Sequence, residues 1–334
     1  MSILPDDNIS AELPTILDLP TEILEIIFSH LQFKDRMSAS LVCRRWSGTA
    51  IPLRKVLLKI AGCWDRSVYE TFLASDRPYR HLEVHNIVSE IRYTSKLISK
   101  FRDSLETLDV ESVYERNWMN ALGGLPRLQE LCLKCPLVVK SPAALRAKRP
   151  CHSMRSLTID EIDGSDFAFL NAFVSETFPG LTSLRLTDFV GDLRINGLPN
   201  LEMLEVVGTG ILDDRLLQDL KALPKLRDIK FTGKMLDLND HAESGTIDKI
   251  QKVELRTSVR IDDDQLLQLT KVFPALDSFL IGCITNCTAA GVEAAKKQLP
   301  KCSFQIYGHR APVYSVKTWS DSESTDLDTD SDSS

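Results

Sequence analysis

Side chains able to do chemistry or bind ligands are concentrated in a few short stretches of the sequence. The nine residues SLVCRRWSG, at 40–48, place a cysteine, two arginines and a tryptophan side by side. This group is compatible with a nucleic-acid contact, with a reactive thiol or with a piece of hydrophobic core. The element that carries these side chains decides between the three.

Two other stretches raise the question of zinc. Cys132 and Cys135 have the spacing of a zinc knuckle, and the adjacent pair Cys151 and His152 follows them. An adjacent pair cannot form the usual chelate loop, and Cys132 falls inside a predicted strand, so packing explains these cysteines better. We expect no metal site here.

No residues stand out as catalytic. His81 and His85 share one face if they belong to a strand, but no third metal ligand accompanies them. Gly208 and Gly210 lack the third glycine of a dinucleotide loop and are better explained as a turn. The chain has no phosphate-binding loop of the glycine-rich Lys-Ser/Thr kind and no Gly-x-Ser-x-Gly elbow, and no spacing marks a catalytic triad. We therefore expect no enzymatic activity, no metal and no cofactor.

Composition indicates a protein of the cytosol or nucleus. Of the 334 residues 43% are hydrophobic and 26% charged, and the eight cysteines are dispersed as reduced thiols usually are. No apolar stretch approaches the ~20 residues that span a bilayer, and the first ten residues do not resemble a signal peptide. The net charge is -7, but six of the 47 acids lie in the last fifteen residues, and the other 41 face 40 bases. A nearly neutral body argues against nucleic-acid binding.

A repeated string organises most of the chain. The pattern L-x-x-L-x-L, with Ile, Val, Phe or Met also allowed and a weak copy beginning at a tyrosine, recurs every 20 to 27 residues. Ten copies begin at Leu53, Tyr79, Leu105, Leu128, Met154, Leu181, Leu201, Leu226, Ile250 and Leu276. A Leu-Pro or Phe-Pro pair precedes several of them, and residues 211–226 match residues 261–276 at nine of sixteen positions.

Each repeat is predicted to be a strand followed by a helix. The alternation in L-x-L is typical of a half-buried strand, while residues 214–223 have apolar side chains at helical spacing, and proline then ends the helix. Such a unit buries its apolar face only by stacking on its neighbours. This pattern resembles the leucine-rich repeats that follow F-boxes. The resemblance implies an α/β solenoid over residues 53–311, of about ten degenerate repeats, with strands inside and helices outside.

Residues 17–52 do not follow the repeat period. A helix is expected to start near Pro20, capped by Thr21 or Asp18, and a second helix to run from about Lys34 to Ala50. The apolar residues of the first helix fill an arc of roughly 200°, about twice the stripe that one core needs. So small a unit cannot cover both flanks of this helix, so either the repeats or another protein must.

The sequence of this unit resembles an F-box. It contains the family's Leu-Pro-x-Glu-Ile/Leu as LPTEI, an apolar helix ending in leucine, a polar turn, and Leu-Val-Cys-Lys/Arg-Arg-Trp as LVCRRW; Arg36 and Met37 stand where two aliphatic residues are usual. F-boxes bind the Skp adaptor of cullin-RING (SCF) ubiquitin ligases. The resemblance therefore assigns to this interface, or to its support, Leu19, Pro20, Ile23, Leu24, Ile27, Leu31, Leu41, Val42, Cys43 and Trp46.

The stretch SLVCRRWSG is then interpreted as one edge of a docking surface. Trp46 would be an aromatic anchor and Cys43 a small buried group. Arg44 and Arg45 would cover the wet side of the helix or pair with nearby acids.

An F-box before leucine-rich repeats is the layout of substrate receptors, which implies a non-catalytic adaptor whose repeats hold a target protein. The alternative is a scaffold that binds the Skp adaptor but recruits no cullin or no degradable target. Candidates for target contact are the solvent-facing residues beside the L-x-L strings, namely Glu106, Asp109, Arg185, Glu202, Glu205, Arg227, Lys230, Glu254 and Arg256.

The two ends of the chain are expected to lack fixed structure. Residues 1–16 are predicted to be flexible and residues 312–334 to be a disordered acidic tail. Ser320, Thr325 and Thr329 each have an acid three residues on, as sites of acidophilic kinases do. The alternative is a solubilising tail with incidental matches.

Overall fold

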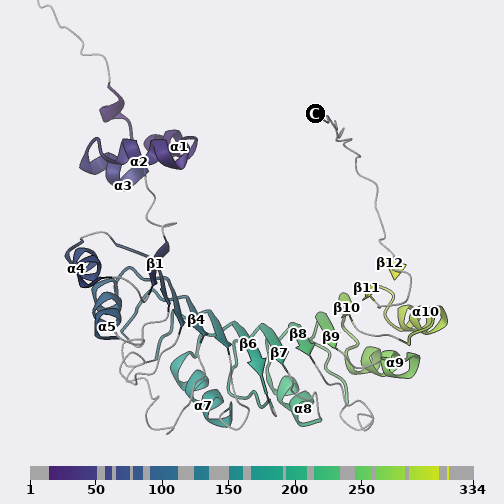
Figure 1. The fold of residues 1–334 in the computed structure, drawn as a ribbon. Coiled ribbons are helices and arrows are strands. Elements are labelled where there is room, and N and C mark those ends of the chain that lie inside the picture. Colours follow the sequence, from purple (N-terminus) through teal and green to yellow (C-terminus); the bar gives the residue numbers. More distant parts are fainter. Residues whose placement is uncertain are drawn as a thin grey trace, which may run out of the picture.

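Two hydrophobic cores organise the chain, one within the first 50 residues and one running through the repeats (Figure 1). The structure is a computed structural model. It describes residues 15–50, 57–61, 65–75, 78–85, 91–111, 124–134, 150–160, 167–190, 193–208, 214–233, 245–257, 261–282, 286–307 and 314–315. Residues 314–315 of the predicted tail are described and form a short strand, while the rest of the tail and its three phosphorylation candidates lie outside these residues.

The first core is held by three short helices. A 3-10 turn, η1 (Ile16–Asp18), leads into α1 (Thr21–Ser29), α2 (Phe33–Ser40) and α3 (Arg44–Ala50), and α3 packs against both other helices. Leu24, Phe28 and Ala50 are buried at its centre. The rings of Phe28 and Trp46 meet edge to face, with their centroids 5.1 Å apart.

The predicted second helix is divided in two, which corrects the expectation of one helix over residues 34–50. The amide of Leu41 bonds to the carbonyl of Ser38 and the amide of Val42 to that of Ala39, so α2 tightens and ends. Cys43 then begins α3, because its sulfur accepts the amide of Trp46 at 3.4 Å as a helix-capping group does.

The capping prediction for the first helix was also wrong. Pro20 precedes α1, and no side chain caps it. The carboxylate of Asp18 instead accepts the amide and the hydroxyl of Thr15, each at 2.8 Å, and so closes the turn η1.

The repeats form one sheet of twelve strands in chain order. The first eleven are parallel to their neighbours: β1 (Leu57–Ala61), β2 (His81–His85), β3 (Thr107–Glu111), β4 (Glu130–Lys134), β5 (Ser156–Asp160), β6 (Ser183–Phe189), β7 (Met203–Gly208), β8 (Asp228–Gly233), β9 (Lys252–Thr257), β10 (Ser278–Gly282) and β11 (Ser303–Tyr307). The last, β12 (Tyr314–Ser315), pairs antiparallel with β11.

Helices lie along the outer side of the arc that the strands make (Figure 1). They are α4 (Arg66–Ala74), α5 (Ile91–Lys100), α7 (Phe167–Thr177), α8 (Asp214–Ala222), α9 (Asp263–Val272) and α10 (Ala289–Gln298). Pro224, Pro274 and Pro300 follow the last three helices, as the sequence predicted. The fold is therefore a leucine-rich-repeat solenoid. No helix in the described ranges combines the length and the apolar character that crossing a membrane requires.

The first register differs from the prediction. The described residues contain eleven parallel strands, in line with the prediction of about ten repeats, and the last of them, β11, follows one more Leu-Pro pair, at residues 299–300. In β1 the buried residues are Leu58 and Ile60, two positions later than the string from Leu53 implies. Their partners across the sheet, Leu82 and Val84, fix this register.

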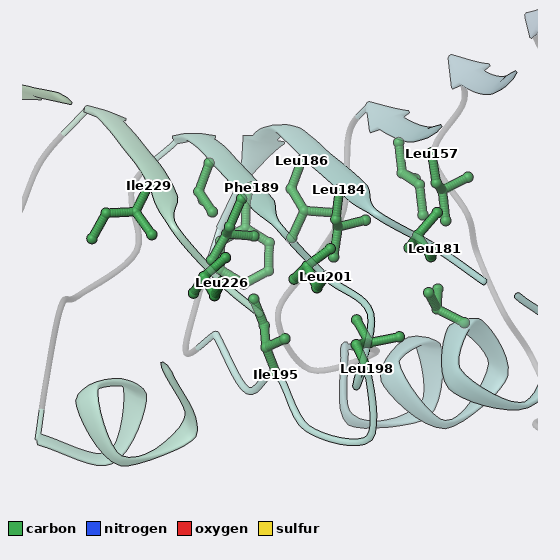
Figure 2. Close-up of a cluster of buried hydrophobic side chains, with 14 of the residues drawn as sticks. Leu157, Leu181, Leu184, Leu186, Phe189, Ile195, Leu198, Leu201, Leu226 and Ile229 are labelled. Atoms are coloured by element: carbon green, nitrogen blue, oxygen red, sulfur yellow. The ribbon is translucent and has the colours of Figure 1, made fainter. Parts of the chain in front are cut away.

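The shortest repeat is built without a helix. Only 20 residues separate the strings at Leu181 and Leu201, and the described residues 193–202 between β6 and β7 form no helix. Figure 2 shows Ile195 and Leu198 from this segment turned into the core beside Leu184 and Leu201. The amide of Ile195 donates to Asp219 at 3.1 Å, so a polar side chain of the next repeat fixes the segment.

Glycine is required where three strands end close together. Gly208 pairs with Phe189 on one side and with Gly233 on the other. Gly233 has a φ of +131°, and a Cβ placed there would lie 1.7 Å from the carbonyl oxygen of Gly208. Neither the backbone angle nor the space admits a side chain.

We predict that Gly233→Ala lowers the free energy of unfolding by about 2 kcal/mol or more, through strain and a backbone clash. Urea denaturation followed by circular dichroism measures this loss. Gly282→Ala is the matched control, because its nearest contact would be the flexible side chain of Arg256, at 3.3 Å, and the backbone carbonyl oxygen of Leu255 would lie 4.0 Å away, at ordinary contact distance. Equal stability losses in the two variants would contradict the prediction.

Candidate partner-binding surfaces

The N-terminal helical unit, residues 15–50, carries most of the exposed large apolar side chains in the described part of the chain. Of nine large hydrophobic residues with open surfaces, seven belong to this small unit: Ile16, Leu17, Ile23, Ile26, Met37, Leu41 and Val42. The other two lie in the repeats. Apolar side chains concentrated in this way mark an interaction surface.

The ten residues predicted for this surface divide into exposed and supporting groups. Ile23, Leu41 and Val42 are exposed, Leu41 with 84% of its surface and Val42 with 60%. Pro20 is exposed as well, whereas Leu24 is fully buried. The remaining five are half-buried: Leu19, Ile27, Leu31, Cys43 and Trp46. The break between α2 and α3 explains the division, because it turns Leu41 and Val42 outward at a corner.

Ile26 and Met37 were not among the ten, yet both are exposed beside them in the chain. Ile26 has 55% of its surface open and Met37 42%. The signal for Ile26 was present in the sequence, since it belongs to the wide apolar arc of the first helix. Met37 gave a signal too, since it is an apolar residue of the predicted second helix at a position where the family usually has an aliphatic one.

Arg45 has a role that the sequence did not indicate. Its guanidinium donates to the backbone carbonyl oxygen of Leu17, at 2.5 Å, and to that of Leu19. It therefore ties α3 to the segment that precedes α1, while its side chain stays exposed to solvent, as predicted, and its charge acts on Asp18.

A second surface is the inner face of the solenoid, where charged side chains stand in rows. Residues Arg185, Glu205, Lys230 and Glu254 are consecutive partners across β6, β7, β8 and β9. Arg185 pairs with Glu205 at 3.6 Å and Lys230 with Glu254 at 3.9 Å, while Arg256 approaches Glu254 to 2.5 Å. Five of the predicted target contacts thus already pair with one another.

The other predicted contacts lie nearer the ends of the sheet or at its edge. Asp109, in β3, accepts the ammonium group of Lys134 at 2.6 Å. Glu106 pairs with Arg80 at 2.5 Å at the position just before a strand. Glu202 and Arg227 occupy the same position before β7 and β8.

Cys132 lies in β4 as predicted, but on the inner face rather than in the core. Leu131 and Leu133 on either side of it are buried, while Cys132 is half-buried. Burial, with a smaller contribution from the negative charge of Asp109, raises the pKa of its thiol to about 12. The thiol is therefore protonated and a poor nucleophile. Cys135 lies outside the described residues.

The two histidines of β2 hold neighbouring strands together. His81 contacts the hydroxyl of Thr107 at 2.5 Å, and His85 lies between the carboxylates of Glu111 and Glu83. The hydrogen bond to Glu111, opposed by burial and reinforced by Glu83, raises the pKa of His85. Across the described residues, no three His, Cys, Asp or Glu side chains gather where they could hold a metal ion.

Comparison with known protein families agrees with the resemblance of the N-terminal unit. Residues 16–51 match the model of the F-box-like family. A search of the curated proteins finds no relative of this chain. Among solved structures, an LRR protein of Leptospira interrogans is similar at 11% identity over 82% of this chain and 80% of that one, with a TM-score of 0.29. The solenoid is shown instead by the register of the parallel strands in this protein. The chain carries an F-box-like domain before a leucine-rich-repeat solenoid.

We predict that His85 contributes pH-dependent stability. Because its pKa is raised on folding from the usual 6.5, its contribution is full below that value and disappears as the pH rises through the raised pKa. The loss of unfolding free energy in His85→Gln should then be larger at about pH 6 than at about pH 9. Denaturation at both pH values checks this, with the exposed His152→Gln as control. A loss that does not change with pH would refute it.

Proposed function

We propose that this protein is a substrate-recognition adaptor of an SCF (Skp–cullin–F-box) ubiquitin ligase, working in the cytosol or nucleus. The F-box-like domain docks on the Skp adaptor and the solenoid holds a target protein. The protein itself performs no chemistry. Its contribution is proximity, since tethering raises the effective concentration of target lysines near the ubiquitin-charged enzyme.

The observation that carries the proposal is the exposed apolar corner of the F-box-like domain. Leu41 and Val42 have 84% and 60% of their surfaces open, next to a core in which Leu24, Phe28 and Ala50 are the fully buried hydrophobic residues among those described. Burial of such side chains on a partner gains about 25 cal/mol for each Å² removed from water. An F-box-like domain supplies the partner's class, because F-boxes generally bind Skp adaptors.

The form of the solenoid supports the second half of the proposal. Its hydrogen-bonded strands make one continuous sheet, so side chains on the inner face keep fixed spacings over many repeats. Stacked repeats of this kind present an extended concave surface for protein binding. A rigid array also holds its target at a constant distance from the docked adaptor better than a flexible linker would.

We predict that Leu41→Ala combined with Val42→Ala weakens binding to a purified Skp adaptor by about 10- to 100-fold without lowering the melting temperature. The side chains are exposed, so their truncation removes partner contacts rather than core. Titration calorimetry measures the affinity. Val190→Ala is the control, since Val190 is an exposed valine of the repeats, with 54% of its surface open. Wild-type affinity of the double variant would place the interface elsewhere.

The alternative is a scaffold that binds the Skp adaptor and recruits no cullin or no degradable target. Isolation of the full chain from cells under gentle conditions distinguishes the two. The adaptor role predicts that both a Skp adaptor and a cullin accompany the chain, and that both are lost with Leu41→Ala/Val42→Ala. A Skp adaptor without a cullin would favour the scaffold, and neither protein would refute both.

A further inference from the structure

The inner face of the solenoid has a hollow of about 300 Å³ at the start of strands β6 to β9. Two residues from each strand line it: Thr182, Ser183, Glu202, Met203, Arg227, Asp228, Gln251 and Lys252. Each pair consists of the first residue of a strand and the residue before it. The hollow is thus built by the repeat register itself, and Met203 gives its lining an apolar side chain.

Four charged side chains in this hollow differ from the paired charges farther along the same strands. Glu202, Asp228, Arg227 and Lys252 make no ion pair and no side-chain hydrogen bond with any described residue. A few ångströms along the same strands, Arg185, Lys230 and Arg256 each reach a carboxylate. Two acids and two bases therefore line one hollow, and none of them forms an ion pair with another.

The order of the charges across the strands is fixed by the register. Met203, Asp228 and Lys252 are consecutive partners on β7, β8 and β9, and Glu202 and Arg227 each precede the first residue of β7 and β8. The acids accordingly belong to β7 and β8, and the bases to β8 and β9. Glu202 and Lys252 stand two strands apart, about 10 Å at the usual strand spacing.

Among these four residues, Asp228 has a charged group that is desolvated enough to shift its pKa. It is half-buried among the strands, and this burial raises the pKa of its carboxyl group despite the nearby positive charges of Lys230 and Lys252. A partly desolvated carboxylate without a hydrogen bond gains from a cationic group that enters the hollow.

We propose that this hollow binds a segment of the target protein that carries one basic and one acidic side chain about three residues apart. The inference rests on the proposed role of the repeats in target binding, and it assigns the chemistry of that target. The basic side chain lies over Met203 and meets Asp228 and Glu202. The acidic side chain meets Arg227 and Lys252, and about three residues of extended peptide span the 10 Å between the two ends.

Synthetic peptides test this inference on the full-length protein. Labelled nine-residue Ser/Ala/Gly peptides carry either one Arg and one Glu at spacings of two, three or four residues, two Arg, or two Glu. Fluorescence anisotropy should show the mixed peptide with a spacing of three binding at least about fivefold tighter than either like-charged peptide. Equal affinities, or no binding at millimolar concentration, would overturn the proposal.

Variants of the hollow should change the charge preference in opposite directions. Glu202→Gln with Asp228→Asn leaves only bases and should favour the two-Glu peptide, whereas Arg227→Gln with Lys252→Gln should favour the two-Arg peptide. Glu293→Gln with Lys296→Gln is the control, since it removes an existing ion pair from α10, away from the hollow, and should leave the order of affinities unchanged. The site would be refuted if no variant changed the order of the peptide affinities, or if the control variant changed that order as much as the variants of the hollow do.

Failure of this inference can be told apart from failure of the proposed function. Each variant preparation is also titrated with the Skp adaptor, which binds through the F-box-like domain. If the variants bind the Skp adaptor with full affinity but the protein shows no preference among the peptides, the proposed peptide site is wrong and the proposed adaptor function is unaffected.

Discussion

The in-register stacking of buried residues from one strand to the next is the constraint on which the rest of the solenoid depends. Leu82, Leu108, Leu131 and Leu157 are successive partners, and all are buried. A one-residue slip would send this row to the inner face and bring charged residues into the core. The backbone extends the same ladder before the strands, as when the amide of Gln129 bonds to the carbonyl of Glu106.

This register also determines the inner face. Residues one repeat apart in sequence become neighbours about 4.8 Å apart across the sheet, so each charge on the face meets whatever charge the next repeat places there. Lys59 and Glu83 pair at 3.1 Å for this reason, as Lys134 and Asp109 do at 2.6 Å. The start of β7 to β9 departs from the pattern because its acids and bases do not meet. Charges that are already paired within the protein have little to offer a partner, whereas the charges of this stretch are available to one.

Much of the fold could be predicted because it follows from period and polarity. The repeated string located ten of the eleven parallel strands, although it misplaced the first by two residues because the degenerate segment near Leu53 offers apolar residues in two registers. Other features depend on single contacts that no pattern encodes. The break before Cys43 arises from a sulfur that accepts one amide, and the role of Arg45 arises from carbonyl groups 26 and 28 residues earlier in the chain. For the same reason, the charged residues beside the strands were predicted as a class, but their pairing could not be.

The two cores place different demands on the two parts of the chain. Every inner repeat is covered on both sides by neighbours, so the solenoid buries its apolar faces without help. The F-box-like domain has too few helices to enclose its apolar residues, and Leu24, Phe28 and Ala50 are its only fully buried hydrophobic residues among those described. A protein that covers Ile23, Leu41 and Val42 therefore supplies core that the domain lacks. Burial of these side chains then contributes both to binding and to the stability of the domain, because a partner that binds only the folded domain raises its stability by mass action. The surface that makes this domain marginal alone is thus the surface that makes it a docking module.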